Sequence, residues 1–345
     1  MKTLFLDEPF AFRYAETEEP QKPGPGEALV QVRRIGICGT DYHAYRGRQP
    51  FFSYPRILGH ELGVEVLEVG AIVDPIPAEL PIRLGDLCAV EPYLNCGTCI
   101  ACRKGKTNCC ASLKVLGVHT DGGMRERIIV PIHKLHRSEK LTLEQLALVE
   151  TLGIGAHAVD RAGIRPGETA LVIGAGPIGL TAVQFARAAG AKVIVMDTNE
   201  HRLSFCAQHM GTEAALMADE NVLDRLLEAN NGDLPDAVFD ATGNIQSMQN
   251  AFKYVSSGGR LTLVGLYLGD LTFYDPDFHR KEITLLATRN STGADFRRIL
   301  GLMESGAIDT NPWITHTCSF EDLTTQFTEW LDPASGVIKA VVSLD

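Results

Sequence analysis

The chain of 345 residues lacks the features that mark secreted, membrane-spanning and nucleic-acid-binding proteins. It has no apolar run long enough to span a bilayer, and its first residues, MKTLFLDEPF, contain no apolar signal-peptide core. Positive charge is scarce, with 32 lysines and arginines against 43 acidic residues and a formal net charge of −11. We therefore expect a cytoplasmic protein without nucleic-acid or membrane partners.

Internal repeats, low-complexity segments and long charge blocks are also absent, and the length predicts two domains. The first 150 residues or so show short alternating strands separated by prolines and glycines, which predicts a β-rich domain. The middle alternates strands and helices, which is typical of a doubly wound parallel sheet. The tail is too short to fold alone, so we predict an α/β protein with segments 1–152, 153–287 and 288–345, the last returning to the first domain.

The best-defined stretch is VIGAGPIGLTAVQFARAAGAKVIVMD, residues 172–197. An apolar run over 170–173 predicts a buried strand, and Gly174, Gly176 and Gly179 follow at GxGxxG spacing. Gly174 allows a sharp turn, Gly176 allows a pyrophosphate to approach, and Gly179 lets the helix lie close to the strand. Pro177 is suited to the first helical position, because its missing N–H costs nothing there.

A second apolar strand over 192–196 ends on Asp197, which completes a βαβ unit. The helix N-terminus offers N–H groups to phosphates, and Asp197 is spaced to accept hydrogen bonds from the adenosine ribose. Its charge would repel a 2′-phosphate, so the unit predicts NAD rather than NADP. Ile178 and Arg202 are assigned to the same cofactor site. The alternative is a glycine-rich turn in an ordinary α/β domain.

Further along, the sequence predicts helices over 200–210, 216–228, 245–255 and 294–305, and strands over 237–240, 260–265 and 337–344. The apolar strands at 260–266 and 282–287 are candidates for pairing across a dimer, because exposed sheet edges need protection.

Nine cysteines in a chain of this class are unlike a disulfide framework, because the cytoplasm is reducing. Four of them follow C-x2-C-x2-C-x7-C in a lobe at about 92–113: Cys96, Cys99, Cys102 and Cys110. Four thiolates on one loop can close a tetrahedral shell around zinc, as a structural site requires. An iron–sulfur cluster is the rival, although such runs have a shorter gap and a following proline, and free thiols are the third possibility. Cys109 is treated as a bystander.

A second set is spread along the chain: Cys38 in GICGTDYH, His60 and Glu61 in LGHE, and Glu150 in LVETLG. A thiol, an imidazole and a carboxylate from separate loops leave one coordination position open for water or substrate. Each residue alone is a poor signal, since a lone cysteine is usually core and a lone glutamate is usually solvated. Together with a nucleotide fold they predict a catalytic zinc.

These motifs, GICGTDYH, GHE, the cysteine lobe and VIGAGPIG in this order, resemble the zinc-dependent medium-chain dehydrogenases over essentially the whole chain. The polyol and sugar-acid branch is most similar, with sorbitol dehydrogenase, threonine 3-dehydrogenase and galactonate-type oxidoreductases as relatives. The resemblance implies a GroES-like catalytic domain joined to a Rossmann domain, two zinc ions per chain, and a homodimer or homotetramer.

The resemblance also implies individual roles. Cys38 and His60 match catalytic-zinc ligands, Glu61 a neighbouring or exchangeable ligand, and Glu150 the glutamate ligand of the polyol branch. Which glutamate is the resting third ligand stays open. Asp41 matches the acid that orients the zinc histidine, and Thr40 and His43 match the groups that relay the substrate proton.

The implied function is oxidation of a secondary hydroxyl of a polyol, sugar or sugar acid to a ketone, with hydride transfer to NAD. The alternatives are threonine 3-dehydrogenase or a small secondary-alcohol dehydrogenase and, from another class, a non-catalytic NAD- or zinc-binding protein. Tyr45, His119 and Arg289 are candidates for substrate contact, with loop packing or cofactor contacts as the alternatives. The exact substrate, its stereochemistry and the direction of the reaction do not follow from the sequence.

Overall fold

The computed structural model describes residues 1–50, 52–72 and 81–345. The chain forms two compact units, one of Met1–Glu150 with Thr292–Asp345 and the other of Thr151–Ser291. The sequence placed the divisions after 152 and 287, so the structure moves both by a few residues. No helix within the described ranges is long and apolar enough to cross a bilayer.

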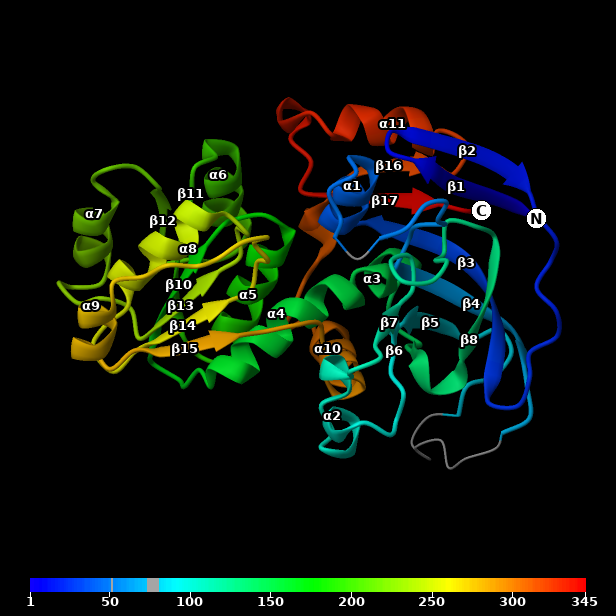
Figure 1. Ribbon diagram of the computed structural model, residues 1–345, viewed down its shortest axis with the longest axis horizontal. Coiled ribbons are helices and arrows are strands. Elements are labelled where there is room, and N and C mark those ends of the chain that lie inside the picture. The colour runs from blue at the N-terminus through cyan, green and yellow to red at the C-terminus, as the bar shows by residue number, and fades with distance from the viewer. Residues whose placement is uncertain (51, 73–80) are drawn as a thin grey trace. The chain divides into compact units, whose positions relative to one another are not determined.

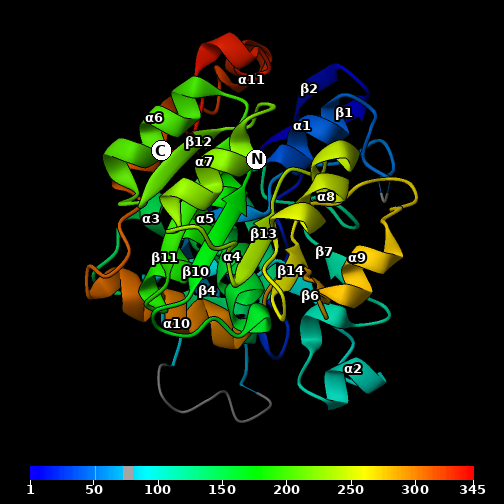
Figure 2. The ribbon, with the colours of Figure 1, turned by 90° about the vertical axis from the view of Figure 1, so that its left-hand side faces the viewer.

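The second unit contains one parallel sheet in the order β12-β11-β10-β13-β14-β15 (Figure 1), and Figure 2 shows β10, β11, β13 and β14 from another side. Its strands are β10 Thr169–Ile173, β11 Lys192–Asp197, β12 Ala214–Met217, β13 Ala237–Asp240, β14 Arg260–Leu263 and β15 Thr284–Ala287. The central strands are almost wholly apolar, because in a doubly wound sheet both faces are covered. The predicted Rossmann-type parallel sheet is confirmed.

The helices that follow these strands begin and end where local chemistry dictates. They are α4 Val149–Ala162, α5 Pro177–Ala188, α6 Glu200–His209, α7 Val222–Ala229, α8 Ile245–Ala251, the 3-10 turn η3 Phe252–Tyr254 and α9 Asp275–Arg280. Pro177 is the first residue of α5, and Gly190 adopts a φ of +87° just beyond its end. Leu171 and Ile173 of β10 pack into one core with Val222 and Leu226 of α7.

Two expectations for this unit are corrected. Residues 214–217 form β12, although a helix was predicted from 216, because Leu216 pairs with Met196 and Met217 with Asp197 in the parallel register. This pairing outweighs the helix propensity of a short Ala-Leu-Met run. Strand β14 lies between β13 and β15, so only β15 of the two strands proposed for dimer pairing lies at the sheet edge.

The first unit is β-rich, and its main sheet runs β16-β17-β3-β4-β5-β9 with β8 also paired to β3. Its strands are β3 Glu27–Ile37, β4 Glu61–Val69, β5 Leu87–Val90, β8 Arg127–Pro131, β9 Leu135–Arg137, β16 Ile314–Ser319 and β17 Lys339–Ser343. Two hairpin-like pairs add β1 Lys2–Glu8 with β2 Ala11–Glu16 and β6 Tyr93–Leu94 with β7 Lys114–Val115. Strand β17 pairs antiparallel with β3, so the tail completes the sheet of the N-terminal segment.

Short helices connect these strands. They are α1 Gly39–Tyr45, α2 Ile100–Arg103, η1 Thr107–Cys109, η2 Ile132–Lys134, α3 Leu143–Ala147, α10 Gly293–Glu304, η4 Asn311–Trp313, α11 Leu323–Trp330 and η5 Pro333–Ser335. Val30, Val32, Val64 and Val66 alternate inward along β3 and β4 and pack with Phe327 of α11 in one core. Figure 1 shows α2 in a cyan lobe beside β6 and β7, which carries the four-cysteine motif.

Candidate metal centres and nucleotide loop

Cys38, His60 and Glu61 lie together where β3 ends and β4 begins. The antiparallel register pairs Gly36 with Glu61, which places the residues after β3 beside the start of β4. A Cβ atom on Gly36 would lie 2.1 Å from Glu61 Oε2 and 3.0 Å from Glu61 Cβ, so a larger residue there would displace this carboxylate. Ligand atoms of the three residues all lie within 4.8 Å of one another. A thiol, an imidazole and a carboxylate at this spacing fit three corners of a tetrahedral zinc site.

Asp41 supports this group from the first turn of α1. Its Oδ2 accepts a hydrogen bond from the Cys38 backbone N–H at 2.9 Å, and its Oδ1 lies 3.8 Å from His60 Nδ1. Nδ1 therefore faces an acid, so Nε2 is the nitrogen suited to a metal. Burial opposes protonation of His60, but the negative charges of Cys38 and Asp41 outweigh burial and raise its pKa well above 6.5. The cluster thus attracts a cation.

Glu150 lies beside this group rather than within it. Its carboxylate is buried at the start of α4 and accepts a hydrogen bond from the Tyr93 hydroxyl. It is close enough for its charge to raise the pKa of His60. The set with mutual distances within 4.8 Å contains Glu61 and not Glu150. In this structure the carboxylate gathered with the thiol and the imidazole is therefore Glu61.

Lys339 is a functional-site neighbour that sequence reasoning missed. It projects from β17, is 2% exposed, and its Nζ lies 2.5 Å from Glu61 Oε1, with Oε2 also in contact. Burial would lower the pKa of Lys339, but the charges of Glu61 and Cys38 outweigh burial and raise it. A single lysine inside the apolar run VIKAVVSL was the available signal, because lysine is almost never fully buried without a partner.

The predicted proton relay, Thr40 and His43, lies on α1, the helix that begins directly after Cys38. The Thr40 backbone N–H lies 3.5 Å from Cys38 Sγ. His43 is exposed, and its position three residues after Thr40 places both on one side of the helix. Partial burial lowers the pKa of His43, and the positive charges of Arg46 and Arg48 lower it further. Its imidazole is therefore neutral at pH 7 and able to accept a proton.

The structure separates the three predicted substrate residues. Tyr45 is a core residue: its ring stacks on Phe12 with centroids 5.0 Å apart, and it is 7% exposed. The expectation that Tyr45 faces substrate is therefore not supported. His119 Nδ1 accepts a hydrogen bond from the Val115 backbone N–H at 3.1 Å, which shows a role in holding its turn. Arg289 is exposed just after β15, and its substrate role stays a prediction.

The four-cysteine lobe brings all its predicted ligands together. The Sγ atoms of the four residues lie within 4.8 Å of one another, and those of Cys99 and Cys102 are 3.5 Å apart. Tetrahedral zinc with Zn–S bonds of about 2.3 Å would separate sulfurs by about 3.8 Å. Backbone N–H groups of Cys96 and Ser112 point at Cys110 Sγ, at 3.3 and 3.4 Å. Cys109 is exposed and outside this set.

The glycine loop has the geometry that the sequence pattern predicts. Gly174 has a φ of +96°, and a Cβ on Gly179 would lie 1.6 Å from Gly174 O. Asp197, at the end of β11, accepts hydrogen bonds from the N–H groups of Ala175 at 2.6 Å and Asn199 at 2.8 Å. The Asp197 carboxylate therefore lies against the loop and is held at the position expected for a ribose contact.

Other predicted cofactor residues lie around this loop. Pro177 and Ile178 form the first turn of α5, and Ile178 O accepts a hydrogen bond from Thr181 Oγ1 at 2.6 Å. The Arg202 guanidinium lies 3.6 Å from the place where a Cβ on Gly176 would be. A positive group beside the open face of Gly176 fits the negative charge of a pyrophosphate.

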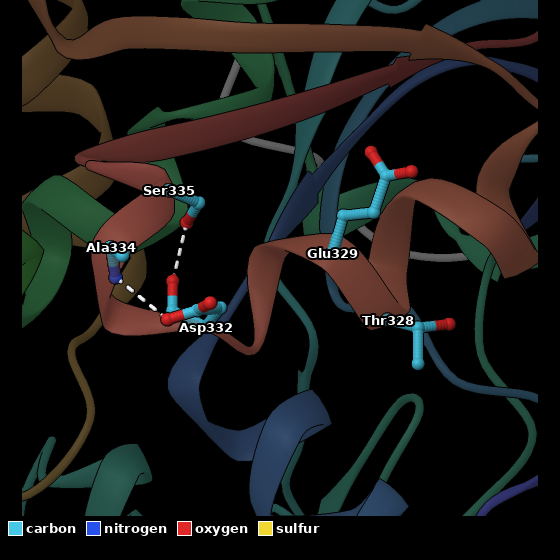
Figure 3. Close-up of a pocket in the computed structure, with 5 residues that line it drawn as sticks. All are labelled: Thr328, Glu329, Asp332, Ala334 and Ser335. Carbon is cyan, nitrogen blue, oxygen red and sulfur yellow. Dashed lines mark hydrogen bonds between the residues drawn. The ribbon is translucent and has the colours of Figure 1, made fainter.

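A separate hollow of about 570 Å³ lies between α11 and η5, lined by Thr328, Glu329, Asp332, Ala334 and Ser335 (Figure 3). Asp332 caps the turn by accepting a hydrogen bond from the Ala334 N–H at 2.9 Å, and Ser335 Oγ donates to Asp332 O at 2.6 Å. The polar groups of Asp332 and Ser335 thus hold the turn, and the hollow is lined by none of the predicted site residues.

Known proteins are similar to this chain over most of its length. Residues 24–140 match the alcohol dehydrogenase GroES-like domain, and residues 177–305 match the zinc-binding dehydrogenase family. The L-galactonate-5-dehydrogenase of Escherichia coli K12 is 39% identical over 99% of both chains. The L-threonine 3-dehydrogenase of Pyrococcus horikoshii is 33% identical over 86% of this chain and 85% of its own.

Among solved structures, the alcohol dehydrogenase RspB of E. coli CFT073, crystallised with NADH, superposes with a TM-score of 0.90 at 29% identity. The match covers 100% of this chain and 99% of that one. The chain therefore combines a GroES-like domain with a Rossmann-like domain.

Proposed function

Because the chain belongs to the zinc-type medium-chain alcohol dehydrogenase family, we propose that it oxidises a secondary hydroxyl of a polyol, sugar or sugar acid to a ketone, with NAD as hydride acceptor. The observation that carries the proposal is the group of Cys38, His60 and Glu61, with ligand atoms within 4.8 Å. This donor set, together with the glycine loop, matches the two requirements of the reaction: an activated hydroxyl and a bound dinucleotide.

The residues of the first unit divide the work. Cys38 and His60 hold the metal, Asp41 fixes the His60 ring, and Lys339 balances the charge of Glu61. Zinc bound there supplies a Lewis acid that lowers the pKa of a substrate hydroxyl, and NAD supplies the hydride acceptor. Thr40 Oγ1 accepts the hydroxyl proton as it releases its own proton, through water or the ribose hydroxyl, to His43. The His43 imidazole, neutral at pH 7, takes up that proton and passes it to solvent.

The two carboxylates near the metal take different roles in this proposal. Lys339 contacts both oxygens of Glu61, so a metal must compete with a buried ammonium group for that carboxylate. Glu150 accepts a hydrogen bond from the neutral Tyr93 hydroxyl, which is a weaker contact than an ion pair. We therefore assign Glu61 as the exchangeable ligand, and Glu150 as the carboxylate that approaches the metal when Glu61 stays with Lys339.

The second unit binds the dinucleotide at the loop of Gly174, Gly176 and Gly179. The N-terminus of α5 receives the pyrophosphate, with Arg202 alongside. Asp197 accepts the adenosine ribose hydroxyls and repels a 2′-phosphate, which supports NAD over NADP. A second zinc ion in the four-cysteine lobe has a structural role, because four thiolates leave no open position.

The substrate class is tested with purified protein and NAD by following NADH absorbance over a panel of polyols, aldonates and free sugars. The relative at 39% identity makes L-galactonate the first aldonate to test. L-Threonine and small secondary alcohols belong in the same panel, because relatives named L-threonine 3-dehydrogenase match at 33% identity. Zinc measured on the same sample should give two ions per chain. A protein with no activity on any hydroxyl substrate would refute the proposal.

We also propose a homodimer or homotetramer, supported by the second unit. Strand β15 is the last strand of its sheet in the described chain, so its outer backbone groups can pair with a second copy. The segment before it exposes large apolar side chains, with Leu266 66%, Leu268 59% and Tyr274 70% exposed. Light scattering coupled to size-exclusion chromatography tests this, and a monomer at micromolar concentration would refute it.

A further inference from the structure

A second group of buried ionisable side chains lies in the first unit, apart from the proposed active site. Glu91 follows β5, Lys134 ends η2 and His136 belongs to β9, and they are 2%, 4% and 6% exposed. Lys134 Nζ donates to Glu91 Oε1, and His136 Nε2 lies 3.2 Å from Glu91 Oε2. None of the three has a role in the proposed reaction. Burying such groups costs free energy, because removing charge from water carries a large penalty.

The Glu91 carboxylate lies against η2, β9 and α10. A Cβ on Gly293 would lie 3.0 Å from Glu91 Oε2, so the first residue of α10 approaches the carboxylate closely. The positive end of this 12-residue helix thus faces an anion. The His136 ring packs on Phe296 of the same helix, with centroids 4.9 Å apart. These contacts fix the position of Glu91, and Glu91 in turn fixes the position of the Lys134 ammonium group.

Lys134 connects Glu91 to the four-cysteine lobe through Asn95. Lys134 Nζ donates to Asn95 Oδ1 at 3.0 Å, and Asn95 Nδ2 lies 3.7 Å from Cys102 Sγ. Lysine can only donate, so the amide oxygen must face it, and the amide N–H group must then face the sulfur. The charge of Lys134 thus selects the one orientation of Asn95 in which Cys102 receives a donor.

We propose that Lys134 is a positioning residue for the metal of the four-cysteine lobe, acting through Asn95 on the Cys102 thiolate. This inference rests on the proposal that the lobe binds zinc. Four thiolates around a divalent ion carry two excess negative charges, and N–H groups directed at the sulfurs stabilise that charge. The network also fixes the lobe to the main sheet at Lys134. Losing it should therefore speed metal loss without changing the four ligands.

The test measures zinc release from the full-length protein with a colour-forming chelator in excess. The Cys38→Ser variant serves as the background, because it leaves the lobe as the remaining zinc site. Adding Lys134→Met should accelerate release about 10- to 100-fold, the usual effect of removing a residue that supports a metal ligand. Lys106→Met is the matched control, since it removes the same charge from an exposed position in the lobe. Its release rate should stay within about threefold of the background.

Two further variants separate positioning from stability. Asn95→Leu keeps the Lys134–Glu91 pair and should release zinc as fast as Lys134→Met. Combining the two should add little, because both remove the same contact. Lys134→Met with Glu91→Gln avoids an unpaired buried carboxylate, so it should regain thermal stability while still releasing zinc quickly.

The outcomes distinguish this inference from the function it rests on. If the Cys38→Ser protein contains no zinc, the lobe is not a zinc site. The proposal that the lobe binds zinc and the positioning role of Lys134 then both fail. If it contains one zinc and Lys134→Met releases it at the background rate, the positioning role alone is refuted. Equal acceleration by Lys106→Met would also refute it, because general charge loss would then explain the effect. Strictly additive effects of Asn95→Leu and Lys134→Met would show that Lys134 does not act through Asn95.

Discussion

The four-cysteine lobe and the mixed-ligand centre are built from the chain in opposite ways. The lobe takes its four ligands from one loop of 15 residues, 96–110, and its thiols are mostly exposed or half-buried. The mixed-ligand centre takes Cys38 from the end of β3, His60 and Glu61 from the start of β4, and Lys339 from the C-terminal strand β17. The glycine loop resembles the lobe in this respect, since 174–202 is also one continuous stretch.

This difference matches the two roles that we propose, a structural one for the lobe and a catalytic one for the mixed-ligand centre. A local loop can saturate an ion without help from the rest of the fold, which suits a structural role. Ligands from several strands are held by the whole sheet, so they can keep one position open without collapsing on the ion. The mixed-ligand centre also gathers negative charge in a buried place, and the positive charge of Lys339 beside Glu61 offsets it. Substitutions there should therefore affect activity and stability more strongly.

The largest effect is expected for Cys38→Ser. Losing the thiolate ligand removes the Lewis acid, which is worth several kcal/mol in the transition state, so kcat/KM should fall at least a thousandfold. The circular dichroism spectrum should be unchanged, because Cys38 is not a core residue. Cys318→Ser, a half-buried thiol on β16, is the matched control and should retain full activity. Full activity of Cys38→Ser would remove this residue from the metal site.

Lys339→Met should have the next largest effect, on stability. It leaves the Glu61 carboxylate buried without its counter-ion, which should lower the free energy of unfolding of the chelator-treated protein by about 3 kcal/mol. Lys339→Met with Glu61→Gln removes both charges and should recover most of the loss. Urea unfolding measures both variants. Equal stability of the single and double variants would mean that the pair does not act as a unit.

Asp197→Ala should change cofactor choice rather than catalysis. Removing its charge ends the repulsion of a 2′-phosphate, so the ratio of kcat/KM with NADP to that with NAD should rise about 10- to 100-fold. Asp197→Asn removes the charge but keeps one acceptor oxygen, because the Ala175 and Asn199 N–H groups bond to different carboxylate oxygens. Asp224→Ala, an exposed acid on α7, is the control. An unchanged ratio in both Asp197 variants would place this residue away from the ribose.

The smallest effect is a shift in the pH profile. Burial, Arg46 and Arg48 hold the pKa of His43 below 6.5, so the neutral imidazole persists down to that lower pKa. On our proposal kcat/KM falls as the pH drops through the pKa of His43, because the protonated imidazole cannot accept a proton. The midpoint of this fall lies below pH 6.5. Arg48→Gln removes one positive neighbour, so the midpoint should rise toward 6.5 by a few tenths of a pH unit. His43→Gln should abolish this limb.

The control for the pH shift is Arg280→Gln, which removes an exposed positive charge from the other unit. Its profile should match that of the unchanged protein. A midpoint that does not move in Arg48→Gln, or a limb that survives in His43→Gln, would assign the proton acceptor to another group.

The same contrast explains how much the sequence predicted. The lobe and the glycine loop lie in single stretches, so their spacing alone identified all four sulfurs and the three glycines that the structure gathers. The Rossmann-type sheet followed from alternating apolar strands and helices. Strand β12 was mistaken for a helix, because its register against β11 is a tertiary property that a short Ala-Leu-Met run does not reveal.

The mixed-ligand centre was predicted only in part. Cys38 and His60 were found through their motifs, but no spacing rule connects them to Lys339, which lies almost 280 residues from Glu61 in the chain. Ring packing also decided against Tyr45: its position on a loop-like motif did not show that Phe12 and Phe327 surround it. The grouping of Glu61 with Cys38 and His60 depends on distances between ligand atoms, and its exchangeable role depends on its contact with Lys339. Sequence supplies neither.

Anomalous X-ray diffraction at the zinc edge, from crystals of the metal-loaded protein, tests the central claim most directly. Our account predicts two peaks per chain, one within bonding distance of Cys38 Sγ and His60 Nε2 with a carboxylate of Glu61 or Glu150, and one among the four lobe sulfurs. An enzyme that is fully active with zinc in the lobe alone, and no peak between Cys38 and His60, would contradict it.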